Sequence, residues 1–361
     1  MRFKSLIGVL LVTVVAVGAF FAISTYKTGE NKVLVVYTYE SLLKWGKNPN
    51  KTLEAVFGGF EKKYGCKVEI RKFSDARAAL LAVINEKNNP KADVIIGLDN
   101  VLVQEAIKEG VIEVYRPSNI EDIPKWLINS LDPTLHSVPY DYGLIALVYD
   151  SKRISPEEMK DLTLDKLASM SDKLVAENPA ISSTGLNFML WEMALSKLEG
   201  RNWTSWWSSV KGKVLIAKGW GDAYNIFLDE KQGRPIVVSY GTDPAYSVYF
   251  YNDTRYRAAL LTYNGERYGW LQVEGISVVK GAPHRDLAEK FVDYFISPEV
   301  QKYIPLNNWM YPANSKVELP EVYKKYALDP TKIKLANELI PVDVIHKNLR
   351  SWLDTWRRVM S

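Results

Sequence analysis

The chain has 361 residues, of which 47% are hydrophobic and 24% charged; these are ordinary proportions for a globular protein, and the length allows two domains with separate cores. Its formal net charge is +4, and because Lys and Arg are spread along the chain rather than gathered, no nucleic-acid partner is expected. Aromatic residues make up 12%, with 21 Tyr and 11 Trp, and either a core or a binding site must account for them.

Residues 1–30 have the pattern of a targeting segment. Arg2 and Lys4 precede an uncharged, mostly apolar run over 6–23, and a polar stretch follows it. This pattern predicts either a secretory signal peptide or an uncleaved N-terminal membrane anchor, because the apolar run lies at the lower limit for spanning a bilayer. We therefore expect an exported protein, periplasmic or at the cell surface, with a tether through the leader as one alternative.

Strand-like and helix-like segments alternate through the first part of the body. The expected strands are 32–39, 66–72 and 93–97, and the expected helices are 52–63, a segment following 74–75, and 101–109. This alternation predicts a doubly wound α/β layer, in which ligands lie beyond the carboxyl ends of the strands. Tyr39, Asp75 and Asp99 each follow a strand, so we expect them at one edge of the sheet. For Asp99, capping the next helix is the alternative.

The second part of the chain repeats the α/β pattern. A long strand pattern at 139–150 leads into a second α/β set, and a return strand near 268–283 is followed by a helix at 285–296. Two α/β lobes connected by long strands predict a central cleft with a hinge. The expected division is residues 31–140 plus 272–312 for lobe 1 and residues 141–271 plus 313–361 for lobe 2.

The stretch 218–249 carries a concentration of aromatic side chains beside turns. Trp220 precedes a helix-like run at 222–228, and an apolar strand at 236–238 stops at Tyr240, with Tyr246 shortly after. Aromatic rings at the end of a buried strand suit a cleft that holds a flat or cationic small molecule. The alternative is that these rings are core packing.

Other aromatic residues are expected to be structural. Tyr140 and Tyr142 flank the crossing strand and are either hinge packing or pocket wall. Six tryptophans outside the 218–249 stretch are expected to be structural: four are interpreted as lobe packing, and two lie four residues apart on a terminal helix that we expect to face the second lobe. These residues are Trp191, Trp203, Trp206, Trp207, Trp352 and Trp356.

The sequence offers little chemistry of the catalytic or metal-binding kind. Cys66 is the only cysteine, so an intramolecular disulfide is excluded, and a buried thiol at a strand start is the expected role. His136, His284 and His346 are scattered without the spacing of metal ligands. Catalytic motifs built on a nucleophile elbow or a phosphate-cradling glycine loop are also missing. We expect no cofactor, no metal site and no enzymatic activity.

Several motifs in order along the body resemble the thiamine-binding proteins of bacterial periplasms, within the type II solute-binding proteins of ABC importers. The motifs are ValTyrThrTyrGlu (36–40), AlaAspValIleIleGlyLeuAspAsn (92–100), ValProTyrAspTyrGly (138–143), SerSerThrGlyLeu (182–186), LysGlyTrp with AlaTyr (218–224), SerTyrGlyThrAspProAlaTyr (239–246) and IleProLeuAsnAsnTrpMetTyrPro (304–312). The resemblance implies a two-lobed fold that binds thiamine, or its mono- or diphosphate, and delivers it to a membrane permease. A monomer is expected.

The resemblance also implies a set of ligand-binding residues. This chain matches the family at four places. These are the ring positions around thiamine, a loop after the second strand, a serine pair at the hydroxyethyl or phosphate end of the ligand, and a loop after Tyr240. They are Tyr39, Trp220, Tyr240, Tyr246 and Trp309; Asp75 and Ala76; Ser182 and Ser183; and Gly241, Thr242, Asp243 and Pro244. Ala76, Ser183 and Asp243 depart from the Gly, Thr and Ser expected there. Asp75 is the candidate acceptor for the aminopyrimidine.

Two points stay open on the sequence alone. Ser182 and Ser183 precede a helical stretch, so they either receive an anion at its N-terminus or simply cap it. Asp243 would disfavour a phosphorylated ligand if its carboxylate faced the cleft. Competing functions are a receptor for iron or a polyamine and, less favoured, a thiamine-degrading transferase, for which Cys66 is the only available thiol nucleophile.

Overall fold

The computed structural model describes residues 32–361, and the predicted signal peptide or anchor at 1–30 lies outside the described residues. Within the described part of the chain, no helix has the length and apolar content needed to cross a membrane.

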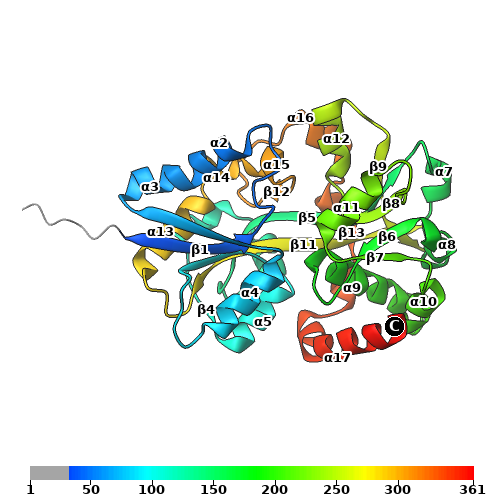
Figure 1. The fold of residues 1–361 in the computed structure, drawn as a ribbon, viewed down its shortest axis with the longest axis horizontal. Coiled ribbons are helices and arrows are strands. Elements are labelled where there is room, and N and C mark those ends of the chain that lie inside the picture. The colour runs from blue at the N-terminus through cyan, green and yellow to red at the C-terminus, as the bar shows by residue number, and fades with distance from the viewer. Residues whose placement is uncertain (1–31) are drawn as a thin grey trace, which may run out of the picture.

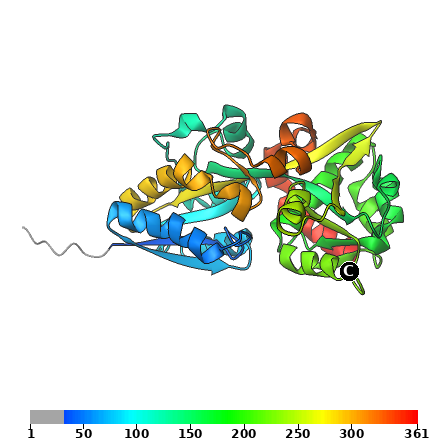
Figure 2. The ribbon, with the colours of Figure 1, turned by 90° about the horizontal axis from the view of Figure 1, so that it is seen from above.

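One mixed sheet runs through two lobes, which lie side by side in Figures 1 and 2. Its strands, in spatial order, are β2 (Lys67–Phe73), β1 (Val33–Tyr39), β3 (Val94–Asp99), β11 (Glu266–Val279), β5 (Val138–Asp150), β8 (Ile236–Tyr240), β6 (Leu174–Glu177) and β7 (Leu215–Ala217). The strands β1, β2 and β3 are parallel in one lobe, as are β6, β7 and β8 in the other. The predicted two-lobed α/β fold is confirmed.

The long strands β5 and β11 connect the lobes. They pair antiparallel from Trp270 opposite Ile145 to Ile276 opposite Val138, and the register shifts between Glu274 and Gly275. In Figure 1 both strands pass through the middle of the molecule, between the two lobes. A register shift locally interrupts the ladder, and here it lies at the crossing, where a hinge has to bend.

Helices cover both faces of the sheet. Those of the first lobe are α2 (Pro49–Leu53), continued by a π-helical segment (Glu54–Gly58) and α3 (Gly59–Tyr64), then α4 (Ala76–Asn85), α5 (Leu102–Glu109), α6 (Lys125–Leu131), α13 (Arg285–Phe295), α14 (Pro298–Gln301) and α15 (Ile304–Asn307). Those of the second are α7 (Pro156–Met159), α8 (Leu164–Ser169), α9 (Ser183–Leu198), α10 (Trp203–Val210), α11 (Trp220–Leu228), α12 (Asp243–Tyr251) and α17 (Val342–Met360).

The remaining elements are short. They are β4 (Ile112–Glu113), β9 (Tyr256–Ala259), β10 (Leu261–Tyr263), β12 (Tyr311–Pro312), β13 (Lys334–Leu335) and α16 (Glu321–Tyr326), with 3-10 turns at Ile120–Asp122, Ser171–Lys173, Pro330–Lys332 and Ala336–Leu339. After β12 the chain first contacts the first lobe, where the Ser315 backbone N–H donates to the Asp122 carbonyl at 3.0 Å, and α16 then packs on α12.

Each lobe has its own apolar core. The first is built around the buried strands β1 and β3. The second contains Trp191, Trp206 and Trp207, and the C-terminal helix α17 closes it because Trp356 packs edge-on against Trp207 with ring centroids 5.6 Å apart. The interpretation of these tryptophans as lobe packing is therefore confirmed.

Candidate ligand-binding site between the lobes

Trp220 and Tyr240 come together at the boundary between the lobes. Trp220 begins α11, and its indole N–H donates to Ser239 Oγ at 2.8 Å, at the end of β8. The Tyr240 ring lies 6.4 Å from the Trp220 ring. Trp45 belongs to the opposite lobe, in the loop after β1, and packs edge-on against Trp220 with the ring centroids 5.3 Å apart. Two predicted aromatic positions are thus brought together, and Trp45 joins them.

Tyr246 and Trp309 belong to the same aromatic group. Their rings meet edge-to-face at 5.1 Å, and the Trp309 indole N–H donates to the Trp45 carbonyl at 3.1 Å. One face of Trp309 stacks on Tyr323 at 5.9 Å, which leaves Trp309 only 5% exposed. Trp309 also has a positive φ of 57°, a backbone region unfavourable for a bulky residue. This strain is a feature associated with functional sites.

Tyr39 occupies the lobe 1 side of the boundary and is held by a polar network. Its hydroxyl lies 2.8 Å from the Tyr140 hydroxyl, donates to Glu274 at 2.9 Å and accepts from Asn308 at 3.1 Å. Gly97 permits this placement, because a Cβ there would lie 2.5 Å from the Tyr39 ring. Burial raises the pKa of Tyr39 well above its usual value, so the phenol stays protonated. Tyr140 is therefore a member of this network.

Glu274 links the two lobes through the hinge strands. Gln272 donates to both Glu274, at 2.8 Å, and the Tyr240 hydroxyl, at 3.2 Å, so the network reaches from Tyr39 to Tyr240. Burial raises the pKa of Glu274 to about 7. Across the strand pair, burial and then Glu274 raise the pKa of Asp141 well above its usual value. The hinge therefore contains two buried acids that resist being charged together.

Asp75 and Ala76 lie at the start of α4. Asp75 caps α4 by accepting from the Arg77 backbone N–H at 3.1 Å, and Ala76 is the buried first residue of that helix. Burial raises the pKa of Asp75 to about 6, with Asp99 adding to the rise and the Ser183 backbone N–H opposing it. The Ser183 backbone N–H of lobe 2 is thus among the groups that act on the pKa of Asp75 in lobe 1.

The serine pair begins α9 as expected. Ser182 is its N-cap, and its hydroxyl accepts from the Gly185 backbone N–H at 3.4 Å. Ser183 is the first residue of the helix and is half-buried. The capping alternative therefore describes Ser182 in this structure.

Asp99 acts as a helix cap. One of its carboxyl oxygens accepts from the backbone N–H groups of Val101 and Leu102, at 3.0 and 2.8 Å, at the start of α5. The other accepts from the Asn187 side chain of α9 at 2.8 Å. The capping alternative is confirmed, with an added contact between the lobes.

The segment predicted as a loop after Tyr240 is largely the start of a helix. Thr242 is the residue before α12 and donates through its hydroxyl to the Trp309 carbonyl at 2.6 Å, while Asp243 and Pro244 form the first turn. The prediction of a loop is wrong for these two residues, because Pro at the second helical position favours helix initiation. Gly241 sits where a Cβ would lie 2.9 Å from Leu328, so only glycine fits without movement.

Asp243 helps to hold the Trp220 side chain in place. It accepts from the Ser239 hydroxyl, which in turn accepts from the Trp220 indole. Burial raises the pKa of Asp243 to about 7. Its carboxyl group is therefore engaged in positioning Trp220.

Sequence reasoning missed Trp45, Glu177, Glu274 and Asn308. Trp45 lies in a polar loop whose sequence gives no sign of what it contacts. Glu177 and Glu274 could have been found from the sequence, since each is an acid among the apolar residues of a strand, and a buried charge needs a partner or a ligand.

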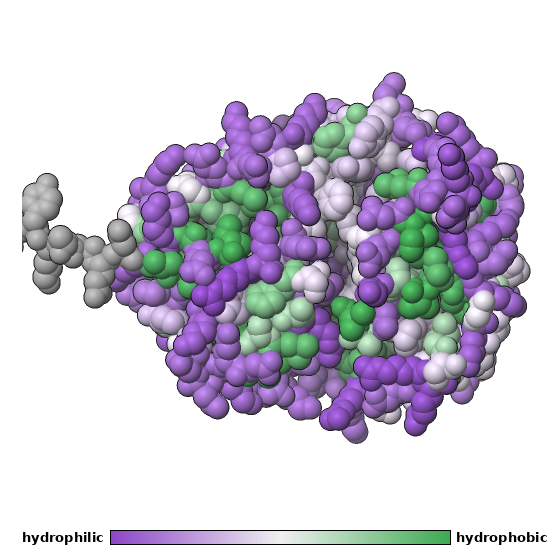
Figure 3. Space-filling model, viewed as in Figure 1, coloured by the Kyte–Doolittle hydropathy of each residue, from purple (hydrophilic) through white to green (hydrophobic). Residues whose placement is uncertain are grey.

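Acidic groups dominate the buried charges. Among residues 32–361 the buried ionisable side chains of Asp, Glu, Lys and Arg type are all Asp or Glu. No group of three or more His, Cys, Asp or Glu side chains in the same range is placed to hold a metal ion. Figure 3 shows the surface hollowed between the lobes, with pale residues of intermediate hydropathy along the boundary. Such an arrangement suits an organic cation better than an anion.

Two α/β lobes, hinge strands and an aromatic, acidic boundary between them define a solute-binding protein. The chain belongs to the family described as bacterial extracellular solute-binding protein, whose model matches residues 45–302. The predicted family resemblance is confirmed.

Individual relatives narrow the comparison. The chain is 31% identical to the "Thiamine-binding periplasmic protein" of Escherichia coli (strain K12), over 91% of this chain and 94% of that protein. It is 32% identical to the protein of the same name from Brucella melitensis, over 90% of each chain. A solved structure named "Periplasmic thiamin binding protein" is similar with a TM-score of 0.74 and 29% identity, covering 91% of this chain and 96% of that one.

Proposed function

We propose that this protein captures thiamine outside the cytoplasmic membrane and delivers it to the permease of an ABC importer. The observation that carries the proposal is the boundary between the lobes, where Trp45, Trp220 and Tyr240 lie close to buried acids without a buried Lys or Arg in the described residues. The names of the relatives that cover almost the whole chain support the choice of ligand.

Thiamine matches this chemistry in both of its rings. Its thiazolium carries a permanent positive charge, and a cation against an aromatic face gains about 0.5 to 2 kcal/mol when desolvated. Its aminopyrimidine needs an acceptor for the exocyclic amine, and Asp75 supplies a carboxyl group at the boundary. Closure of the lobes about β5 and β11 would remove both rings from water.

Two competing functions fit the residues less well. Iron receptors need phenolate ligands, whereas burial raises the pKa of both Tyr39 and Tyr240 well above the usual value. A thiamine-degrading transferase needs a reactive thiolate. Cys66 lies at the amino end of β2, away from the carboxyl ends that form the site, and burial raises its pKa.

A polyamine receptor is the second candidate function, because the structure has more buried acids at the boundary than the sequence analysis predicts there. Calorimetric titration of the full-length protein with thiamine, spermidine and ferric citrate tests the proposal. We expect saturable 1:1 binding of thiamine and no comparable heat from the other two. Tight binding of spermidine without thiamine binding would transfer the function to the second candidate.

A further inference from the structure

Three acids lie side by side where the hinge strands cross between the lobes. Glu274 of β11 is paired in register with Asp141 of β5 on one side and with Asp99 of β3 on the other. All three side chains are buried, and no Lys or Arg among residues 32–361 is buried with them. Ionising all three would be costly, because their charges repel and burial removes the water that would screen them. At least one of these acids is therefore protonated in the free protein.

Glu274 has the hydrogen bonds of a group that is prepared to ionise. Its carboxyl group accepts from the Tyr39 and Tyr140 hydroxyls, at 2.9 and 2.5 Å, and from the Gln272 side chain, at 2.8 Å. All three donors are neutral, so they would stabilise a carboxylate here without neutralising its charge. A positive charge nearby would complete that stabilisation.

Asp141 is less well prepared to carry a negative charge. It accepts from the Asn308 side chain at 2.5 Å, and its second carboxyl oxygen has no hydrogen-bond partner among residues 32–361. Burial and then Glu274 raise the pKa of Asp141 well above its usual value, whereas burial raises the pKa of Glu274 to about 7. Asp141 therefore keeps its proton near pH 7, and Glu274 is the acid whose proton can leave.

The other titratable groups around Glu274 do not supply a counter-charge. Asp99 adds to the rise in the pKa of Glu274. Arg77 acts on Asp99, but its guanidinium is 3.3 Å from the Glu105 carboxylate and is thus already paired. Three phenols around Glu274 stay protonated because burial raises the pKa of each well above the usual value; they are Tyr39, Tyr140 and Tyr240. A charge brought by the ligand is the counter-charge that remains.

Both sides of the proposed ligand site are connected to Glu274. Tyr39 of lobe 1 donates to it directly, and Gln272 donates both to it and to the Tyr240 hydroxyl of lobe 2. These hydrogen-bonded groups are largely removed from water, and charges interact more strongly in such surroundings than in water. A cation held against the rings of Tyr39 and Tyr240 therefore acts on the Glu274 carboxyl group.

We propose that thiamine binding expels the proton of Glu274 to the solvent, and that the ionised carboxylate becomes the counter-ion of the bound cation. The carboxyl O–H bond breaks, its electron pair stays on Glu274, and the three donors already in place hold the carboxylate. Because binding releases a proton, affinity for thiamine rises with pH. This linkage rests on the proposed function and adds to it a residue that selects for the positive charge of the ligand.

Calorimetric titration of the full-length protein with thiamine in PIPES and in Tris at pH 7 counts the released protons, because the two buffers take up protons with different heats. Native protein should release about half a proton per thiamine, since a pKa of about 7 leaves Glu274 about half protonated. The aminopyrimidine of thiamine is unprotonated at this pH, so the proton comes from the protein. Glu274→Gln cannot ionise, so it should release far less and bind thiamine roughly tenfold more weakly at pH 8.

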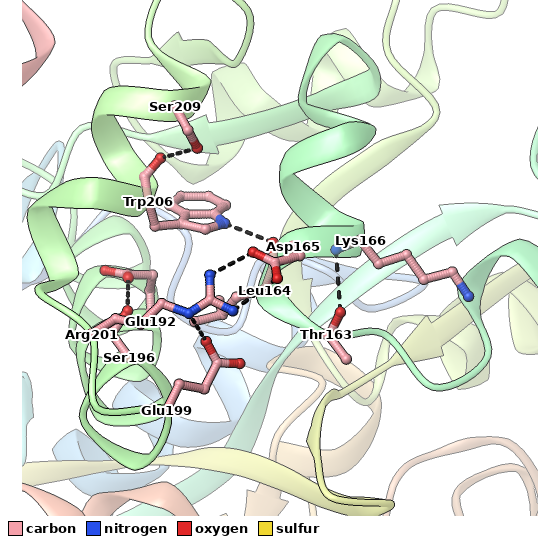
Figure 4. Close-up of polar contacts among 10 residues, drawn as sticks. All are labelled: Thr163, Leu164, Asp165, Lys166, Glu192, Ser196, Glu199, Arg201, Trp206 and Ser209. Carbon is pink, nitrogen blue, oxygen red and sulfur yellow. Dashed lines mark hydrogen bonds and ion pairs between the residues drawn. The ribbon is translucent and has the colours of Figure 1, made fainter.

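Glu192→Gln is the matched control. Glu192 is also a fully buried glutamate whose pKa burial raises, to about 8, but it accepts hydrogen bonds from Ser196 at 2.6 Å and Trp207 at 3.0 Å inside lobe 2, as Figure 4 shows for Ser196. Its replacement should leave both the proton count and the affinity for thiamine unchanged. Circular dichroism of both variants shows whether each retains the native fold.

The possible outcomes are distinguishable. If native protein binds thiamine without releasing a proton, the linkage is overturned while the proposed function stands. If Glu274→Gln still releases as many protons as native protein, the proton comes from another acid, such as Asp243, and the role of Glu274 is overturned. An equal loss of protons in Glu192→Gln overturns it as well. If thiamine does not bind at all, the proposed function fails and the linkage fails with it.

A second measurement needs no variant and therefore remains decisive if Glu274→Gln does not fold. Native protein should bind thiamine up to roughly tenfold more tightly at pH 8 than at pH 6, because the carboxylate that accompanies the cation is then already formed. Equal affinity at the two pH values would overturn the linkage.

Discussion

Two groups of aromatic side chains in this molecule use the same residue types for opposite purposes. Inside lobe 2, Trp206 and Trp207 are at most 5% exposed and pack edge-on with centroids 5.0 Å apart. Between the lobes, Trp45 and Trp220 also pack edge-on, at 5.3 Å, but both are only half-buried and belong to different lobes. The first group packs within one lobe, whereas the second makes contacts between the two lobes.

Both groups anchor an indole to a buried acid. Trp207 donates to Glu192 directly, and Trp220 donates to Ser239, which donates to Asp243. The difference lies in what surrounds each ring. In the lobe core the neighbours of the ring belong to the same lobe, so we expect stability to depend on it. At the boundary Trp220 has Trp45 of the other lobe as a neighbour, so we expect ligand binding to depend on it instead.

The largest expected effect is on stability in the lobe core. Trp207→Ala should lower the free energy of unfolding by about 3 to 5 kcal/mol, because it removes a large, fully buried side chain. Trp220→Ala should lower it by about 1 kcal/mol at most, since its ring is half-buried. Urea unfolding followed by circular dichroism measures both. Equal losses for the two variants would remove the distinction between the groups.

The next largest effect is the dependence of stability on pH that Asp243 and Glu192, the two acids that anchor the indoles, should cause. Burial raises the pKa of Asp243 to about 7 and that of Glu192 to about 8, so the folded protein retains protons that the unfolded chain releases near pH 4. Stability should therefore fall as pH rises from about 4 to 8, by on the order of 2 to 4 kcal/mol for each acid.

Asp243→Asn and Glu192→Gln should each flatten this fall, because neither replacement carries a titrating proton. Unfolding by urea at pH 5 and pH 8 gives the slope for native protein and both variants. A slope that is unchanged in Asp243→Asn would mean that Asp243 is ionised in the folded protein throughout this range.

A smaller effect is expected on thiamine binding at the boundary. Trp220→Ala should weaken thiamine by on the order of 1 to 3 kcal/mol, and Trp220→Phe by much less, because an aromatic face remains for the cation. Trp207→Phe serves as the control in the lobe core and should leave affinity unchanged. Intrinsic tryptophan fluorescence reports the titration. Native affinity in a folded Trp220→Ala variant would exclude that ring from the site.

Trp309→Ala should combine the stability loss expected in the lobe core with the affinity loss expected at the boundary. Trp309 is only 5% exposed, yet its indole also donates to the Trp45 carbonyl, so loss of the side chain should reduce both stability and thiamine affinity. Titration and unfolding of the same preparation separate the two losses, each expected at about 1 to 3 kcal/mol. A loss confined to stability would assign Trp309 to the core alone.

The smallest effect is expected at Ser182. As the N-cap of α9, its replacement in Ser182→Ala should cost about 1 kcal/mol of stability and weaken thiamine and its phosphates equally. Unfolding and parallel titrations with the three ligands check this. A selective loss of the phosphates would instead support the alternative in which the serine pair receives the anion.

Much of the fold follows from local patterns in the sequence. The apolar run before Tyr39 is β1, the run from Val138 to Asp150 is β5, and the predicted helix at 285–296 is α13 with a one-residue difference at its end. These elements were predictable because hydrophobic periodicity and turn residues act over a few neighbouring positions. The start of α12 at Asp243 was missed because glycine and proline nearby also occur in loops.

The candidate site was predictable only in part. Trp220 and Tyr240 lie a short distance apart in the sequence, and a buried strand ending at Tyr240 was enough to indicate a site at its carboxyl end. Glu177, Trp45 and Asp75 were not connected by any local pattern. They come from three separate segments, and their places at the boundary depend on how β5 and β11 set one lobe against the other.

The sequence by itself determined the alternation of strands and helices, the two-lobed class and the family, because these depend on periodicity and on residues close along the chain. The tertiary structure alone decided that Asn187 of one lobe donates to Asp99 of the other, that Trp45 packs on Trp220, and that Glu177 is buried without a hydrogen-bond partner among the described residues. Such contacts join distant segments across a hinge, and whether a polar group is satisfied depends on every segment that surrounds it.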